Sequence, residues 1–437
     1  MPVKYRFRDH GDRGTRSPRK IRYEIQGSNR EMDYHDRRKR NQPVRLDDRI
    51  DDIADLTLAK LNDHDRYLRS FKRSKSDMGL SAGTDRIRGD EYSIPELAEA
   101  LRRLSRTIGD GSFVPNDHRQ VQLPKPNGKF RTLSIPVFAE RVVARSFNNA
   151  LLDVLDKRFP DSFHAYRRDR GILTLIASIA RAYDPAKPLF VATADIENAF
   201  PTTPRNAVED SLSKYVPDEA LRNTLLRFSY PRESQLGLPQ GLATSPTLFI
   251  LMLSHVLTRG YPESGYDATA LLTYSDNLVY VSGAKESIME AHRLHTQELE
   301  AIGMRFKADL PLTPVNIAQG SIDVLGTTIS TRNGRISFRP GPDGWNKLFL
   351  QIRDTYLHPY ISAGAGEAMS GWISRNRHIV NSFGAPAIVD RLRTYCTQAN
   401  ILDVPWDAIT NASVRAAEQW RLMVDGHQIQ LPPEPET

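Results

Sequence analysis

Cysteine is almost absent from this 437-residue sequence, in which Cys396 is the single example. One thiol can form neither a disulfide within the chain nor a cysteine-based zinc site. Long apolar runs are also missing, because the longest, at 189–194 and 248–253, fall well short of the roughly 18 residues that span a bilayer. Residues 1–10 lack the apolar segment of a secretory signal. These absences predict a cytoplasmic protein in a reducing environment, without a membrane partner.

The basic charge is concentrated at the N-terminus. Residues 1–50 hold fifteen Lys and Arg against eight Asp and Glu, and this excess equals the net charge of +7 for the whole chain. The segment includes a run of four basic residues, Arg37, Arg38, Lys39 and Arg40. Such an arm on a neutral body favours a nucleic-acid partner held through phosphates, although a solvated tail has the same composition.

Hydrophobic periodicity predicts a chain that mixes helices with short antiparallel strands, an α+β protein. Apolar residues recur at helical spacing over 46–72, after Ser93, and through most of 345–425. A buried strand is expected at 189–194, and strands joined by turns are expected near residues 127, 276 and 333. The hydrophobic content of 39% is sufficient for a core, and the length suggests two to four packed units.

Two carboxylates stand where predicted strands end. Asp195 follows the buried strand in VATADIENAF, and Asp276 lies at the hairpin tip in TYSDNLVYV. Carboxylates held rigidly at one edge of a sheet can bind a pair of Mg²⁺ ions, which clamp the attacking and leaving oxygens of a phosphoryl transfer. Taken singly, each aspartate is better explained as a turn or cap residue.

Two further segments have the composition of a nucleotide site. Residues 237–246, GLPQGLATSP, place Gln240 between glycines that let the backbone approach a ligand. Lys125, Lys129 and Arg131 lie on the hairpin near residue 127, where Lys129 and Arg131 share one face and can hold a triphosphate. A solvated basic face is the simpler explanation of that pair alone.

Together these segments resemble the reverse transcriptases, most closely the bacterial group II intron proteins and their stand-alone, defence-associated relatives. The resemblance runs from about Gly83 to Phe338. The matching strings, in order, are SAGTDRI, LPKPNGKFRTLSIPVFAERVV, SFHAYRRDRG, DIENAF, GLPQGLATSP, YSDN, Gly303-Met304 and Val324-Leu325-Gly326-Thr327. It implies a right-hand polymerase fold with fingers, palm and helical thumb.

The resemblance also implies a division of the chain. A basic extension is expected at 1–78, partly irregular and then helical. The remaining parts are fingers at 79–190, palm at 191–338 with fingers segments at 205–240, a helical thumb and C-terminal region at 339–428, and a disordered tail at 429–437.

Roles follow for matching residues. Asp195 and Asp276 would ligate two Mg²⁺ ions, or Mn²⁺, with help from the Ile196 carbonyl. Lys129 and Arg131 would grip the incoming triphosphate, and Gln240 would position the nucleotide. Phe200 occupies the position of the aromatic steric gate that disfavours ribonucleotides, although the same ring could be a core residue.

Two positions depart from the family pattern. Asn277 stands where a second aspartate is usual, so the site has one negative charge fewer. This change could weaken Mg²⁺ binding, favour Mn²⁺ or mark specialised synthesis. Leu310 stands where a lysine is expected, and nearby Lys307 does not clearly replace it in proton donation.

The expected activity is therefore RNA-directed DNA synthesis from dNTPs on an RNA template with a DNA or RNA primer, in the manner of bacterial anti-phage defence enzymes. The partners left open are a dedicated non-coding RNA, a partner protein and a second copy of the chain. Two alternatives remain: an atypical polymerase making repeat, untemplated or RNA products, and a non-catalytic RNA-binding protein.

Overall fold

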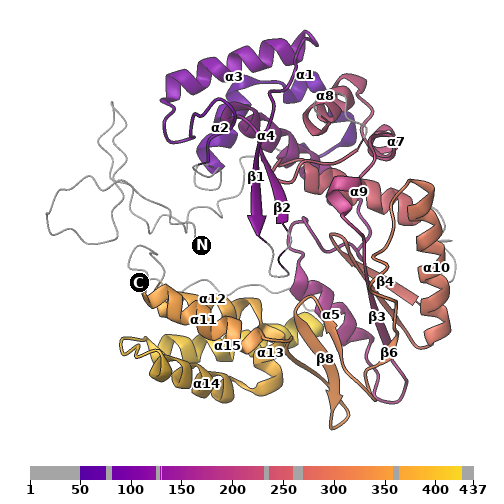
Figure 1. Ribbon diagram of the computed structural model, residues 1–437, viewed down its shortest axis with the longest axis vertical. Coiled ribbons are helices and arrows are strands. Elements are labelled where there is room, and N and C mark those ends of the chain that lie inside the picture. The colour runs from indigo at the N-terminus through magenta and orange to yellow at the C-terminus, as the bar shows by residue number, and fades with distance from the viewer. Residues whose placement is uncertain are drawn as a thin grey trace, which may run out of the picture.

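The computed structural model describes residues 50–74, 81–124, 128, 130–230, 236–258, 269–357 and 364–425. Its elements follow one another around an open arc, from helices α1–α4 at one end through the strands to helices α11–α15 at the other (Figure 1). The basic run Arg37–Arg40 and the expected C-terminal tail lie outside these residues. Within the described residues no helix is long and apolar enough to cross a membrane.

The first unit is a helical layer carrying a two-stranded hairpin. Its helices are the 3₁₀ turn Ile53–Asp55, α1 Leu58–Leu61, α2 His64–Ser74, α3 Ile94–Gly109 and α4 Phe138–Leu155. The hairpin strands β1 Arg119–Pro124 and β2 Phe130–Ile135 pair antiparallel, as predicted. The predicted start of α3 is confirmed, because Ser93 and Glu96 form a capping box there.

The prediction of a single helix over 46–72 is wrong. The chain instead makes three short elements, because local side-chain caps interrupt it. Asp52 accepts a hydrogen bond from the Ala54 N–H and Thr57 accepts one from the Lys60 N–H, so each begins a new turn. Such caps satisfy backbone donors that a continuous helix would pair internally, and they fix an extended residue at each start.

A four-stranded antiparallel sheet forms the centre of the molecule, in the order β4-β5-β3-β6. Its strands are β3 Phe190–Asp195, β4 Thr269–Tyr274, β5 Asn277–Ser282 and β6 Val315–Asn316. Alternation along the strands sends Ala192, Ala194 and Tyr280 into one core and Val191 and Val279 into another. The sheet is therefore covered on both faces, and its end at Asp195 is held from two sides.

One face of the central sheet is covered by helices, and the other face is covered by helices together with a second sheet. The first core takes in α9 Ser245–Thr258 and α10 Lys285–Ala301, and the short helices α6 Ala199–Thr202, α7 Arg205–Tyr215 and α8 Glu219–Ser229 extend it. The second core takes in α5 Ile172–Ala182 and the three-stranded sheet β7 Ile322–Val324, β8 Thr327–Arg332 and β9 Arg335–Pro340. The hairpin predicted at Asn333-Gly334 is confirmed, and both turn residues have positive φ.

The C-terminal region is helical, as predicted. It comprises α11 Gly344–Leu357, α12 Ala365–Arg375, α13 Arg377–Phe383, α14 Ala385–Gln398 and α15 Trp406–Val424. Trp372 and Trp420 are buried, and the Trp420 ring meets the Phe338 ring of β9 edge-on at 5.4 Å between centroids. The helical region is thus packed directly against the second sheet.

Candidate active site

The two predicted aspartates lie at one end of the central sheet, Asp195 on β3 and Asp276 in the turn between β4 and β5. Asp195 ends β3, and its cross-strand partner on β5 is Asn277, the residue after Asp276. The Ile196 N–H donates a hydrogen bond of 3.0 Å to the Asp276 carbonyl. Residues paired in this way have Cα atoms about 4.5–5.5 Å apart. The structure therefore brings Asp195 and Asp276 together, although 81 positions separate them in the sequence.

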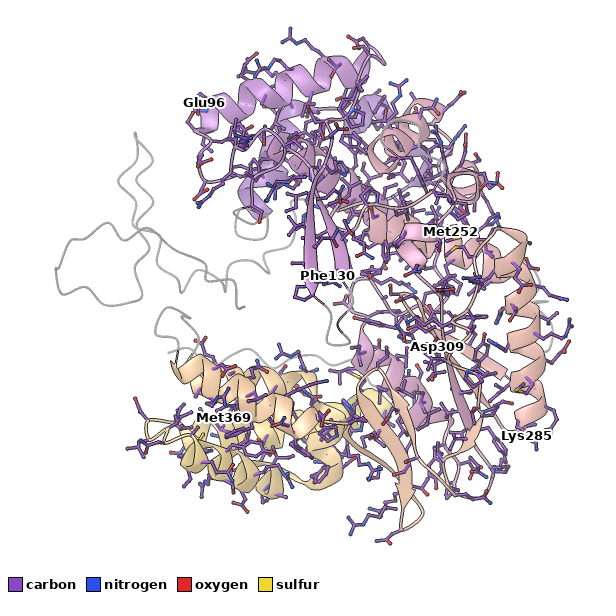
Figure 2. All side chains as sticks on the ribbon, viewed as in Figure 1. Glu96, Phe130, Met252, Lys285, Asp309 and Met369 are labelled. Carbon is purple, nitrogen blue, oxygen red and sulfur yellow. The ribbon has the colours of Figure 1, made fainter. Side chains whose placement is uncertain are left out.

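A short segment after α10 locks the end of β3 from its other side. Ile196 and Phe306 form an antiparallel bridge, and the Lys307 N–H donates to the Asp195 carbonyl at 2.9 Å. The Lys307 Nζ lies 2.6 Å from the Asp195 Oδ1. Asp309, labelled in Figure 2, belongs to the same segment. The cation at this carboxylate is therefore Lys307. Leu310, which occupies the position where the resemblance predicts a lysine, is 54% exposed.

The donors present suit hard divalent cations. Mg²⁺ is usually bound through one or two carboxylates together with water and substrate phosphates, so two aspartates suffice without a full protein cage. Among the described residues no third His, Cys, Asp or Glu completes a cluster. The Lys307 ammonium on Asp195 is a stand-in for such an ion, because it gives the carboxylate the positive partner that a metal would give. The Asn277 Nδ2 donates to the Asp276 Oδ1 at 3.4 Å, so Asn277 is a neighbour of the site without adding a charge.

Lys307→Met is expected to tighten divalent-ion binding by roughly fivefold. The side chains of Lys307 and Asp195 are 36% and 19% exposed, so their ion pair is worth at most about 1 kcal/mol, and a binding ion must displace it. Mn²⁺ titration followed by electron paramagnetic resonance, without nucleotide, measures the change. Lys285→Met, which removes an exposed cation on α10, is the control and should leave binding unaltered. Equal or weaker Mn²⁺ binding by Lys307→Met would exclude competition by the ammonium.

The glycine-containing loop docks on both the β1–β2 hairpin and α6. The Ser134 N–H of β2 donates to the Gln240 carbonyl at 2.7 Å, and the Leu238 N–H donates to the Phe200 carbonyl at 2.8 Å. Gly241 has a φ of +124°, and a Cβ there would lie 2.3 Å from the Ser134 carbonyl oxygen, so glycine is required. The Gln240 Oε1 is buried and has no hydrogen-bond partner within the described part of the chain. An acceptor left in this state fits the predicted contact with a nucleotide.

Phe200 belongs to a row of three aromatic rings. It is half-buried and stacks on Phe249 of α9, with ring centroids 4.9 Å apart and an interplanar angle of 23°. On its other side the Tyr166 ring meets it edge-on at 6.5 Å. The ring is therefore firmly supported, and it also packs against the first core. The steric-gate role stays a prediction, because this packing agrees both with a steric gate and with an ordinary core residue.

Tyr166 is a site residue that the sequence did not single out. Residues 162–164 pair with Thr273 of β4, which brings Tyr166 to the turn of the β4–β5 hairpin. The Tyr166 and Ser275 hydroxyls are 3.0 Å apart, and both residues have left-handed backbones, with φ of 57° and 59°. Such conformations are uncommon outside glycine and persist where surrounding contacts hold them. The hydroxyl pair therefore ties the segment 162–166 to the residue before Asp276.

The pKa of the Tyr166 phenol is shifted by burial and by the charges of neighbouring site residues. Burial raises the pKa of its phenol above the ordinary value of 10.0, and the Asp276 charge acts in the same direction. The hydrogen bond with Ser275 and the positive charge of Arg131 lower it in part. Arg131, which is exposed on β2, therefore lies within electrostatic range of Tyr166. Lys125 and Lys129 lie outside the described residues, so their predicted contacts with a triphosphate stay predictions.

Tyr166→Phe and Ser275→Ala are each expected to slow single-turnover nucleotide addition about fivefold at saturating dNTP. Each removes the same hydrogen bond, worth about 1 kcal/mol, and loosens the turn that carries Asp276. Because the bond is shared, the double variant should be no slower than the slower single variant. Rapid-quench kinetics on the four proteins completes the cycle. Losses that multiply in the double variant would show that this bond does not link the two segments.

Comparisons with known proteins agree with this geometry. Residues 123–329 match the family described as reverse transcriptase (RNA-dependent DNA polymerase). The chain is 26% identical over 209 residues to the putative COX1/OXI3 intron 1 protein of Saccharomyces cerevisiae, covering 46% of this chain and 24% of that protein. It is 23% identical over 234 residues to the group II intron-encoded protein LtrA of Lactococcus lactis subsp. cremoris, covering 49% of this chain and 38% of that protein.

A solved telomerase from Candida albicans, in complex with a TWJ fragment of telomeric RNA, is a distant structural neighbour. It has a TM-score of 0.43 and 12% identity, covering 71% of this chain and 60% of the telomerase chain.

The central antiparallel sheet has two neighbouring aspartates at one end, and 207 consecutive residues that include it match the family model. These findings agree with the predicted right-hand polymerase fold of α+β class. The similarity to the reverse transcriptase family covers residues 123–329, a little less than half of the chain. The chain spans less than half the length of the yeast and Lactococcus relatives. The predicted boundaries of fingers, palm and thumb stay predictions.

Proposed function

We propose that this protein is an RNA-directed DNA polymerase, a nucleotidyltransferase that adds dNTPs to the 3′ end of a DNA or RNA primer on an RNA template. The observation that carries the proposal is the close approach of Asp195, at the end of β3, to Asp276, in the turn before β5, with the Lys307 ammonium on Asp195. Two carboxylates held close together in this way can bind the two divalent ions that assist phosphoryl transfer.

The chain's own residues would hold the reactants in place. Asp195 and Asp276, with the Ile196 carbonyl, would hold two Mg²⁺ or Mn²⁺ ions, which when bound stabilise the charge on the transferring phosphoryl group. Arg131 would contact the triphosphate, and Gln240 would accept a hydrogen bond from the nucleotide through its buried Oε1. In the reaction the oxygen of the primer 3′ hydroxyl bonds to the α-phosphorus and its proton passes to solvent, while the bond from the α-phosphorus to the α–β bridging oxygen breaks and pyrophosphate leaves.

Incorporation of labelled dNTPs on a primed RNA tests the proposal, with Mg²⁺ and Mn²⁺ supplied in separate reactions. Extension that depends on the RNA sequence supports it. Product sequencing separates templated DNA from repeat, untemplated or RNA products, which Asn277 leaves possible by removing one negative charge from the site. Salt-sensitive RNA binding without extension under either ion would identify a non-catalytic binding protein instead.

The biological setting also belongs to the proposal. We expect a role in bacterial anti-phage defence from the stand-alone relatives that the sequence resembles, and action in the cytoplasm. A dedicated non-coding RNA, a partner protein or a second copy of the chain stays a prediction.

A further inference from the structure

The β8–β9 hairpin has one face in the core and one face that is entirely polar. Cross-strand partners share a face, and the pair Ile329–Phe338 is buried in the second core. The opposite face is formed by the pairs Thr328–Arg339, Ser330–Ser337 and Arg332–Arg335. These six residues are called the arginine face below. It contains hydrogen-bond donors throughout and no apolar side chain.

The arginines of this face carry positive charge that the described residues do not neutralise. Arg332, Arg335 and Arg339 are exposed, and no carboxylate of the described chain lies within ion-pair distance of them. Arg332 and Arg335 stand directly opposite each other, an arrangement of like charges that destabilises a hairpin. An anion bound between them would remove this repulsion.

The arginine face continues into the catalytic end of the sheet. The Arg339 guanidinium contacts the Ser321 Oγ at 3.5 Å, and Thr328 donates a hydrogen bond to Asp323 of β7. Ser321 and Asp323 line a cavity of about 350 Å³ whose wall also contains Asp195 and Asn277. From Thr328 to Arg332 the strand advances about 13 Å, at roughly 3.3 Å per residue. The face is thus a polar path leading from the catalytic cavity to the hairpin tip.

We propose that the arginine face is a docking surface for RNA, bound through its phosphates. Arginine, serine and threonine side chains are the usual protein donors to phosphate oxygens, and arginine does so with paired N–H groups. The absence of apolar side chains argues against insertion into a lipid surface, and against the apolar centre typical of a protein interface. The proposal rests on the proposed function, in which RNA is the template, but it concerns binding outside the reaction centre.

The test is the triple variant Arg332→Gln, Arg335→Gln, Arg339→Gln in the full chain. Fluorescence anisotropy with a labelled single-stranded RNA measures affinity across a salt series. Each lost phosphate contact lowers the slope of log affinity against log salt by about 0.7, so three lower it by roughly 2. At about 0.1 M salt the same loss weakens binding by roughly a hundredfold.

A matched control removes three arginines that are already paired. Arg102, Arg293 and Arg353 contact Glu99, Glu290 and Asp354, so the triple change to glutamine alters the net charge equally. The control should lose far less affinity and keep its slope. The inference is overturned if the arginine-face variant keeps wild-type affinity and slope, or if it loses only binding to anionic vesicles. Loss of RNA binding in a protein that makes no DNA would uphold this inference and reject the proposed activity.

Discussion

Replacing either Asp195 or Asp276 by asparagine will reduce nucleotide incorporation by roughly a thousandfold or more, about 4 kcal/mol in activation free energy. Asparagine keeps the shape of the side chain and its turn chemistry, but removes the charge that, in the proposed function, would hold divalent ions beside the triphosphate. Asp195 is fixed at the end of β3 and Asp276 in the turn before β5, so neither carboxylate can move into the place of the other. Single-turnover extension of a primed RNA, at saturating dNTP and metal, measures the loss.

The control for this prediction is Asp184→Asn, at a partly exposed residue of the loop before β3 whose carboxylate contacts only Lys187 among the ion pairs of the described residues. It should extend primers at the wild-type rate. Both site variants should retain RNA binding, since their change lies away from the arginine face. Extension by either site variant at more than a tenth of the wild-type rate would show that its carboxylate is not a metal ligand in the reaction.

The strands that carry the site could be predicted because their local signals agree with the final structure. The apolar run before Asp195 favours a buried strand, and Ser275-Asp276 between two such runs favours a tight turn. Asn333-Gly334 likewise specifies its hairpin, with positive φ at both positions. The helix predicted from Leu46 to Lys72 failed because apolar spacing outweighed Asp52 and Thr57 in the prediction, whereas in the structure their caps break the chain.

The contacts of two site residues could not be predicted by such reasoning. Lys307 reaches Asp195 only because the segment after α10 pairs with Ile196, a contact between residues more than a hundred positions apart. Tyr166 reaches Ser275 through the pairing of 162–164 with β4, and nothing in the periodicity of that segment indicates a strand. Contacts of this kind depend on register between distant segments, which local patterns do not specify.

Phe200→Ala is expected to relax discrimination against ribonucleotides by roughly tenfold to a hundredfold. The ring is held in place by Phe249 behind it and Tyr166 beside it, so in the steric-gate role it cannot turn away from a 2′-hydroxyl. Alanine would open that space, and differences of one small group in a pocket are worth about 1–3 kcal/mol. The ratio of kcat/KM for each dNTP to that for its rNTP measures the change.

A matched variant separates this effect from a general loss of packing. Phe349→Ala makes the same deletion at a half-buried ring of α11, which contacts Tyr395 in the C-terminal helices. Both changes cost stability, because both remove apolar contacts, but only Phe200→Ala should alter the dNTP to rNTP ratio. An unchanged ratio in Phe200→Ala, together with lower stability, would identify Phe200 as a core residue and leave discrimination to other groups in the site.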